Sequence, residues 1–483
     1  MAESTPLPYR PYAGLPPLAG IGTFEEAMHP GLSIDDCVSR LKRHHWAFRR
    51  LHEIMLTRLT AEPIYELKMA FSLHAHYCAE HAAAWRERVG EMREPPLRLD
   101  DVPHAGLEVF FDEIKAAPDT LSLLTGIYGV ALPALRDALQ RHLEDTNPLV
   151  DHPTVRRCRF ALLEVDEMIA YGSASIASLT AVAPAESQPG GREDWVRLLE
   201  SMLESAGGLD GIGDTTGAVP AARYSASPPA PDWVPQRDER FVDPCNMGVH
   251  AEAFLYNENL PVEAKPLMLY YKRLREIDVP EMMASIIAET KGKPWAYTVD
   301  MTRQLWDESR HAMMGEVGFV RAGIDWSRLV RINKTWSLAL NTQLTPIERH
   351  AVLYFIEQGL MPKTGKRFEW ETGIASGDEY AAMIQDYDWA DEVLHARIGR
   401  DWYVKDRESP QEAVTFGDAC WSKVLIDWER YRADGVTEHA NWWPGLYQEW
   451  CDIHGKTPDP AALAFNTSYA TARADLKDIS ASG

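Results

Sequence analysis

Two stretches of this sequence repeat one pattern: DESRHAMMG at 307–315 and DEVLHARIG at 391–399. Both read D-E-x-x-H-A-x-x-G, so a glutamate and a histidine stand three residues apart in each. Residues with this spacing lie on the same face of an α-helix. Each stretch therefore predicts a helix that points one carboxylate and one imidazole in the same direction. A third Glu-x-x-His, at 26–29, lacks the flanking residues and precedes Pro30, and we interpret it as a chance match.

The spacing of apolar residues predicts an all-α protein that contains two four-helix bundles in tandem. Only the second bundle carries the two motif stretches, and metal is therefore expected in that bundle alone. An N-terminal extension, a first bundle, a linker, a second bundle and a helical, Trp-rich C-terminal extension are expected at 1–32, 33–180, 181–247, 248–405 and 406–483, respectively. The linker is assigned from its Pro/Gly/Ser-rich ends, because this composition marks domain boundaries. Both motif stretches fall in the second bundle.

Individual helices follow from the same periodicity and from Pro and capping residues. In the first bundle they are expected at 36–59, 62–91, 106–146 and 153–180. In the second they are expected at 262–290, from 294 to beyond 315, at 345–359 and from 376 to about 404, with a further helical stretch at 326–343. Pro280 is expected to kink the first of these helices. Capping boxes are predicted at 345–348 and 376–379.

The first bundle has features of a diverged duplicate of the second. Glu80 and Glu167 are separated by nearly the same number of residues as Glu308 and Glu392. In the first pair, the position three residues after each Glu is alanine instead of histidine. The hypothesis is an internal duplication whose first copy has lost its metal ligands.

A metal site built on the paired motifs needs carboxylates from two further helices. The helix at 262–290 offers Glu276 and Glu281, which lie about 140° apart around a helix and cannot both face one site. If the following turn is centred near Gly292, Glu276 lies at the height of Glu308. Glu276 is therefore favoured, and Glu281 is the alternative.

The helix at 345–359 offers Glu348 and Glu357, which face opposite ways because they are nine residues apart. Glu348 already has a place in a predicted capping box. Glu357 is therefore the expected carboxylate of this helix.

With these choices the second bundle supplies E, E-x-x-H, E and E-x-x-H from four helices. This pattern resembles the ferritin-like di-iron carboxylate superfamily. The run IEQGL at 356–360, together with DEVLHARIG, looks like an oxygenase-type ferritin-like family, and it is more distantly similar to tRNA-hydroxylating and CoA-ester-epoxidising members. The resemblance implies a ferritin-like bundle whose metal ligands are Glu276, Glu308, His311, Glu357, Glu392 and His395. It also implies that Asp391 accepts the ring N–H of His311, and Asp307 that of His395.

Four carboxylates and two imidazoles suit two iron ions, as Fe2+ or Fe3+, because hard oxygen ligands hold both oxidation states. Four carboxylates also neutralise two divalent ions, which lowers the cost of burying them. Manganese, or a mixed Mn/Fe pair, uses an overlapping ligand set and stays open.

The expected function is a non-haem di-iron oxidase or oxygenase, a cytoplasmic monomer or homodimer that uses dioxygen to oxidise a small organic substrate. A ferroxidase or iron-handling protein is the alternative, although a long chain with added segments suits a substrate pocket better than a storage shell. A metal-dependent structural protein, or coincidental core histidines, also stays open. Because no flavin or NAD fingerprint is evident, electrons are expected from an external donor or from the substrate.

The composition narrows the classes of partner. A net charge of −23 argues against nucleic acid and anionic membranes, which attract basic surfaces. No apolar run reaches the length of a membrane span, and the N-terminus lacks the features of a signal peptide. The six cysteines are scattered without a C-x-x-C pair, which predicts free thiols in a protein of the reducing cytoplasm.

Overall fold

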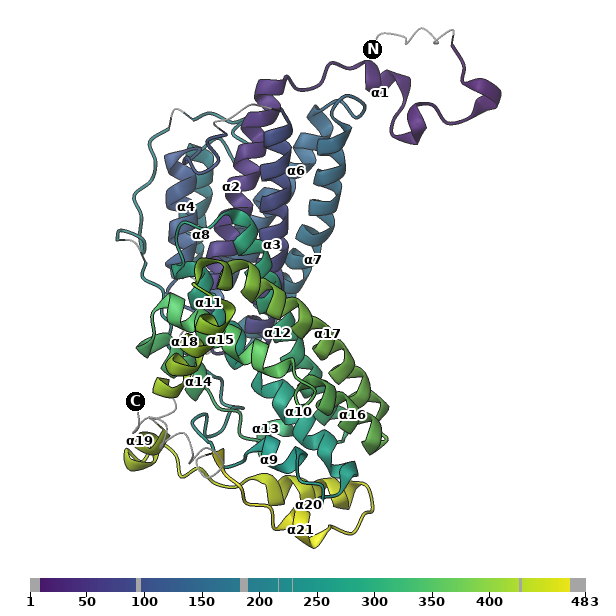
Figure 1. Ribbon diagram of the computed structural model, residues 1–483. Coiled ribbons are helices and arrows are strands. Elements are labelled where there is room, and N and C mark those ends of the chain that lie inside the picture. The colour runs from purple at the N-terminus through teal and green to yellow at the C-terminus, as the bar shows by residue number, and fades with distance from the viewer. Residues whose placement is uncertain are drawn as a thin grey trace. The chain divides into compact units, whose positions relative to one another are not determined.

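The structure, a computed structural model, describes residues 9–92, 97–182, 190–215, 217–227, 229–424 and 428–469 (Figure 1). Every regular element within these ranges is helical, and no β-strand occurs among them. The prediction of an all-α protein is therefore confirmed. None of the described helices combines the length and the apolar composition that crossing a membrane requires.

The chain divides into two compact units. The first consists of Met1–Ile54 and Tyr77–Ala230, and the second of Met55–His76 and Pro231–Gly483. Two long helices, α2 (Ile34–Leu59) and α3 (Tyr65–Met92), contribute residues to both units. Residues 55–76, which fall inside the bundle predicted at 33–180, therefore group with the second unit.

Short helices precede α2, namely η1 (Tyr12–Gly14), η2 (Leu18–Gly20) and α1 (Phe24–Met28). The first unit continues with α4 (Ala105–Lys115), α5 (Thr120–Leu124), the π-helical η3 (Thr125–Ala131), α6 (Leu132–Asp145), α7 (His152–Val182) and α8 (Gly190–Ser205). The single helix predicted at 106–146 is thus interrupted. Asp119 starts a new helix there because its side chain accepts a hydrogen bond from the backbone N–H of Ser122, at 2.8 Å.

The carboxylates on which the duplication hypothesis rests lie on the surface of the first unit. Glu80 of α3 and both Asp166 and Glu167 of α7 are exposed. They therefore do not line an interior site, and the internal duplication stays a hypothesis that rests on sequence spacing alone.

The second unit contains the helices that carry the two motifs. They are α9 (Ala251–Leu255), η5 (Val262–Ala264), α10 (Lys265–Arg275), α11 (Asp278–Glu289), α12 (Trp295–Arg321), α13 (Trp326–Leu329), α14 (Thr335–Gln343), α15 (Pro346–Leu360), α16 (Lys366–Ser376), α17 (Glu379–Trp402), η6 (Val404–Asp406), α18 (Pro410–Val424), α19 (Trp428–Ala433), α20 (Trp443–Ile453) and α21 (Pro460–Leu463). The long helix α12 packs against α10 and α11, and α17 packs against α12, α15 and α16. The two motif helices are thus neighbours.

The helix predicted at 262–290 is broken into α10 and α11. Pro280 has no amide hydrogen, so the carbonyl of Glu276 cannot receive the usual helical bond from the residue four positions later. The N–H of Val279 bonds to that carbonyl instead, at 2.9 Å, which tightens the turn. Glu276 consequently lies at the joint between the two helices.

Helix α16 was not predicted. Its first turn buries the charged residues Lys366 and Glu369, so it lacks the simple apolar stripe from which helices are recognised. The capping box predicted at 376–379 is also wrong, because Ser376 ends α16 and Asp378 caps α17. The box at 345–348 is confirmed, with both reciprocal hydrogen bonds present.

The Trp-rich C-terminal segment packs into the core of the second unit. Trp443 contacts Phe254 of α9, with ring centroids 4.4 Å apart, and Trp442 contacts Tyr271 of α10 at 4.7 Å. The described part of this segment therefore supports the helix that leads to Glu276.

Candidate metal centre

The two motif helices point their Glu and His side chains into the interior of the second unit. Glu308 and His311 lie on α12, and Glu392 and His395 lie on α17. Each of the four is at most 2% exposed. Such burial is rare for carboxylates unless a partner compensates the charge.

Two further carboxylates complete the cluster. Glu276, from the joint between α10 and α11, groups with Glu308, His311 and Glu392, and the candidate ligand atoms of these four lie within 4.8 Å of one another. Glu357 of α15 groups in the same way with Glu308, Glu392 and His395. Two ligand sets therefore exist, and both contain Glu308 and Glu392.

Glu308 shows how one side chain serves both sets. Its Oε2 atom lies 3.5 Å from Nδ1 of His311, and its Oε1 atom lies 3.2 Å from Nδ1 of His395. One carboxylate oxygen thus faces each imidazole, as expected of a carboxylate that spans two cation positions.

Glu281, the alternative to Glu276, lies outside both sets. It is fully buried, and its carboxylate pairs with Lys68 and Arg237 and accepts a hydrogen bond from Ser337 at 3.0 Å. This network satisfies Glu281 without a metal. The structure therefore places Glu276, and not Glu281, beside the motif residues.

The unpartnered atoms of the cluster test whether a metal fits. Nδ1 of His311 and of His395, and Oε2 of Glu276, Glu357 and Glu392, are buried without a hydrogen-bond partner. Leaving buried polar atoms unpaired is costly. These five atoms belong to the two ligand sets, so bound cations would supply the missing partners. Buried Glu/His clusters of this kind can hold a metal ion.

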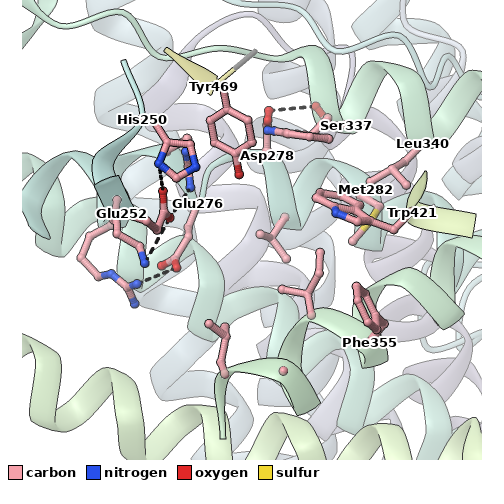
Figure 2. Close-up of a pocket in the computed structure, with 18 of the residues that line it drawn as sticks. His250, Glu252, Glu276, Asp278, Met282, Ser337, Leu340, Phe355, Trp421 and Tyr469 are labelled. Carbon is pink, nitrogen blue, oxygen red and sulfur yellow. Dashed lines mark hydrogen bonds and ion pairs between the residues drawn. The ribbon is translucent and has the colours of Figure 1, made fainter. Parts of the chain in front are cut away.

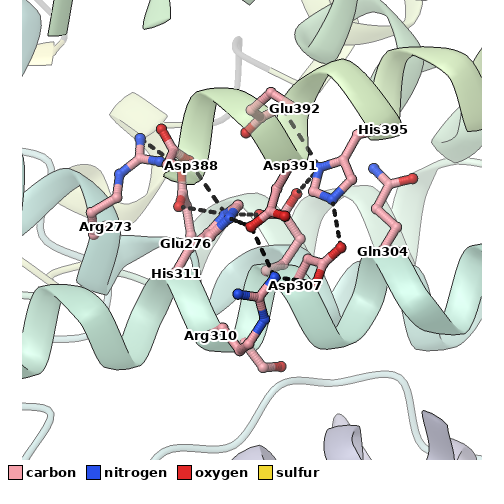
Figure 3. Close-up of polar contacts among 12 residues, drawn as sticks. Arg273, Glu276, Gln304, Asp307, Arg310, His311, Asp388, Asp391, Glu392 and His395 are labelled. Atoms are coloured by element: carbon pink, nitrogen blue, oxygen red, sulfur yellow. Dashed lines mark hydrogen bonds and ion pairs between the residues drawn. The ribbon is translucent and has the colours of Figure 1, made fainter. Parts of the chain in front are cut away.

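The outer nitrogen of each imidazole is held by an aspartate of the opposite motif (Figure 3). Nε2 of His311 lies 3.2 Å from Oδ2 of Asp391, and Nε2 of His395 lies 3.4 Å from Oδ2 of Asp307. Arg310 hydrogen-bonds both aspartates. An N–H at Nε2 leaves the lone pair on Nδ1, the atom that faces the cluster.

The pKa values show how strongly the cluster favours cations. Burial by itself lowers the pKa of His311, but the neighbouring carboxylates of Asp391, Glu276 and Glu308 outweigh burial and raise the value to about 10. Burial and the adjacent Glu392 raise the pKa of Glu357 well above its usual value. Without metal, protons therefore balance part of the negative charge.

Cationic side chains that sequence reasoning missed also contact the cluster. Lys366, the first residue of α16, lies with Nζ 2.8 Å from Oε1 of Glu392 and 2.9 Å from Oδ1 of Asp388. Arg273 of α10 lies 3.0 Å from Glu276 and also pairs with Asp388. Burial alone would raise the pKa of Glu392, but Lys366, Glu357 and His395 together outweigh burial and hold the value well below the usual one.

Only some of these missed residues had a signal in the sequence. Asp388 precedes Glu392 by four residues, and Gln304, which donates to Glu357 at 3.1 Å, precedes Glu308 by four. This spacing places each on the face of a motif glutamate. Arg273 likewise precedes Glu276 by three residues, whereas Lys366 comes from another helix and no local pattern marks it.

The glycine that ends each motif has a packing role. A Cβ atom at Gly315 would lie 2.3 Å from the backbone nitrogen of Leu274 and 2.5 Å from the carbonyl oxygen of Tyr270, both in α10. A Cβ atom at Gly399 would lie 2.5 Å from the ring of Tyr354 in α15. Glycine therefore lets α10 and α15, the helices that lead to Glu276 and Glu357, approach the motif helices closely.

A second group of metal-ligand residue types lies in the first unit, formed by Cys37, His142 and Asp151. Their hydrogen bonds are already taken. Asp151 receives bonds from Cys37 at 3.3 Å, from Thr146 at 3.0 Å and from Arg88 at 2.8 Å. This group therefore does not require a cation.

Comparison of the chain with protein-family models, curated proteins and solved structures finds no match. Inference about function accordingly depends on the geometry of the centre in the second unit.

Proposed function

We propose that the second unit is a ferritin-like carboxylate bundle that holds two iron ions, and that the protein is a non-haem di-iron oxidase or oxygenase. The observation that carries this proposal is the pair of buried ligand sets that share Glu308 and Glu392. Glu308 and Glu392 are thus common to both candidate sets and would help to hold both ions of a pair. Glu80 and Glu167, which correspond by spacing to Glu308 and Glu392, are exposed, so the proposal concerns the second unit alone.

The donor set supports iron over softer metals. It offers four carboxylates and two imidazoles and no thiolate, which suits iron, or manganese, better than copper or zinc. When bound, a reduced di-iron pair supplies the electrons and open coordination positions with which dioxygen is activated. The electrons for such chemistry would come from an external donor or from the substrate.

The surrounding residues orient and enclose such a centre. Asp391 and Asp307 fix the imidazole orientation, and Arg310 ties the two aspartates together. Lys366 and Arg273 contribute positive charge beside Glu392 and Glu276, respectively, and so reduce the net negative charge around the centre. Five of the six candidate ligand side chains are buried, whereas Glu276 is 18% exposed and lines the adjoining cavity, so bulk water is kept from every side of the centre except this one.

A cavity favours an organic substrate over the alternative of a ferroxidase. The cavity, of about 480 Å³, is lined by Glu276 and by apolar side chains that include Met282, Leu340 and Phe355. A site that oxidises only Fe(II) has no need of an apolar cavity of this size.

The proposal is tested by anaerobic Fe(II) loading, metal analysis and an oxygen pulse followed by absorbance. We expect two irons per chain in the wild type and loss of iron and of oxygen consumption in Glu308→Ala. Asp386→Ala, on an exposed position of α17, is the matched control and should behave as wild type. Fewer than one iron per chain in the wild type, or equal iron in wild type and Glu308→Ala, would overturn the proposal.

A further inference from the structure

The cavity beside Glu276 has an apolar side and a charged side, and the difference suggests what it binds. It is formed within the second unit by residues of α9, α10, α11, α14, α15, α16 and α18, with His250 and Tyr469 from other segments. Its volume of about 480 Å³ suits a small organic molecule.

The apolar side is walled by aromatic and aliphatic side chains. Trp336 and Trp421 stack with ring centroids 4.3 Å apart and an interplanar angle of 17°. Figure 2 shows Trp421, Met282, Leu340 and Phe355 together, opposite Glu276. A molecule in the cavity therefore places an apolar body against this wall.

The charged side has more cations than free carboxylates. The cationic lining residues are Lys272, Arg273, Arg275 and Lys366, and the acidic ones are Glu252, Glu276 and Asp278. Asp278 is paired with Arg237 at 2.9 Å, and Glu276 belongs to the metal centre. Among the acidic lining residues, only Glu252 then remains to compensate the cationic side chains of the lining.

Arg275 shares its carboxylate partner, Glu252, with Lys272. Its Nη2 atom lies 3.4 Å from Oε1 of Glu252, and the same oxygen lies 3.3 Å from Nζ of Lys272. Its Nη1 atom has no hydrogen-bond partner. By contrast Lys272 also pairs with Glu369, and Arg273 and Lys366 pair with Asp388. Burial lowers the pKa of Arg275, but Glu252, Tyr469 and Tyr271 outweigh it and raise the value, so the guanidinium stays charged. The unused N–H group at Nη1 is what a further acceptor in the cavity would satisfy.

We propose that this cavity binds a small carboxylic acid, with its carboxylate at Arg275 and its apolar body against the Trp336–Trp421 wall. Arg275 precedes Glu276 in the chain, and Figure 2 shows Glu276 on the side of His250 and Glu252. The carboxylate end of the ligand therefore lies nearer to the metal centre than the far end of the apolar body. This assignment rests on the proposed function, because it names the class of substrate for that centre.

The experiment uses the full chain loaded with Mn(II), so that no turnover occurs, and measures binding by isothermal titration calorimetry. The probes are 4-phenylbutanoate, its amide and 4-phenylbutylamine, which share one apolar body and differ in the charge of the head group. We expect the acid to bind at least about tenfold more tightly than the amide and the amine, because only the acid offers a charged acceptor to the guanidinium.

Two variants locate the site. Arg275→Gln should weaken binding of the acid roughly tenfold and leave binding of the amide unchanged, whereas Arg275→Lys keeps the charge and should retain most of the preference. Leu340→Trp should abolish binding of all three probes by filling the apolar side. Circular dichroism and metal content of each variant show whether it folds. If Arg275→Gln does not fold, the comparison of Arg275→Lys with Leu340→Trp decides the location.

Tighter binding of the amine or amide than of the acid, acid binding that Leu340→Trp leaves intact, or no binding of any probe would overturn the proposal. Failure of the proposed function is distinguishable. If only the carboxylic-acid assignment is wrong, the protein still binds two irons per chain and still consumes oxygen. Failure of the di-iron assignment appears instead as missing iron, while selective binding of the acid by the metal-free chain persists.

Discussion

Asp391 on α17 holds the imidazole of His311 on α12, with Oδ2 and Nε2 3.2 Å apart. Asp307 on α12 does the same for His395 on α17. Each motif therefore contains a carboxylate that supports the other motif's histidine, so neither stretch forms its half of the centre alone. This reciprocity explains why the residue before each motif glutamate is an aspartate.

The aspartate–histidine pair can be tested by Asp391→Asn. An amide cannot provide the charge-assisted bond that orients the ring, and loss of such supporting bonds costs about 10- to 100-fold in metal affinity. We expect a fall of that size in Fe(II) affinity, measured by competition with a chelator, with little change in the circular dichroism spectrum. Asp386→Asn, exposed on the same helix, should match wild type. Unchanged affinity in Asp391→Asn would contradict the role of this pair.

Lys366→Met tests whether a lysine takes over part of the metal's charge in the metal-free protein. Without metal, the substitution leaves the buried carboxylate of Glu392 without its lysine partner, whereas Asp388 keeps Arg273. Breaking a buried pair costs about 3–5 kcal/mol. With metal bound, Glu392 is compensated and the loss should be smaller. Thermal unfolding with and without Mn(II) measures both values. Lys405→Met, at an exposed ion pair, is the control. Equal losses in the two states would refute this account.

Gly315→Ala tests the close approach of α10 and α12. The new Cβ atom meets backbone atoms of Leu274 and Tyr270, which cannot rotate away, so the helices must separate. We expect roughly 1–3 kcal/mol of destabilisation, typical of overpacking, together with weaker Fe(II) binding because Glu276 follows α10. Urea unfolding and metal titration report the two effects.

Two other glycines supply the comparison for that experiment. Gly399→Ala should cost less than Gly315→Ala, because the atom that it meets belongs to the ring of Tyr354, which can shift. Gly445→Ala in α20 meets nothing within 4 Å and should leave metal binding unchanged. If Gly315→Ala behaves like Gly445→Ala, the close approach does not position Glu276.

His350 predicts a loss of stability in acid. This histidine is buried, and burial lowers its pKa from 6.5 to about 4. Between these values the unfolded chain binds the proton and the folded chain does not, so the free energy of unfolding decreases as the pH falls from about 6.5 to 4. The contribution of this one group is about 3 kcal/mol.

His350→Gln should flatten this pH dependence, because glutamine does not titrate. Urea unfolding at pH 7 and pH 4.5 measures the difference between the two free energies, which should be smaller in the variant than in the wild type. His29→Gln, at an exposed position, should leave the difference as it is in the wild type. An unchanged difference in His350→Gln would show that this histidine is not held neutral.

The local part of the candidate centre could be predicted from the sequence. The spacing of Glu308 to His311 and of Glu392 to His395 places each pair on one helical face, whatever surrounds the helix. The height argument that favoured Glu276 over Glu281 also agrees with the placement in the structure, although Pro280 breaks the helix between them. Such features depend on residues within a few turns of one another, which is why they can be read along the chain.

The sequence by itself thus determined the all-α class, the two motif helices and the residue types that converge on the centre. Tertiary structure alone decided that Glu308 and Glu392 are shared by two candidate ligand sets, that Lys366 contacts Glu392, that Arg273 contacts Asp388, and that a cavity with one charged side adjoins Glu276. The physical reason is distance along the chain. Charge compensation and cavity shape arise where separate helices meet, and helical periodicity carries no information about which helices those are.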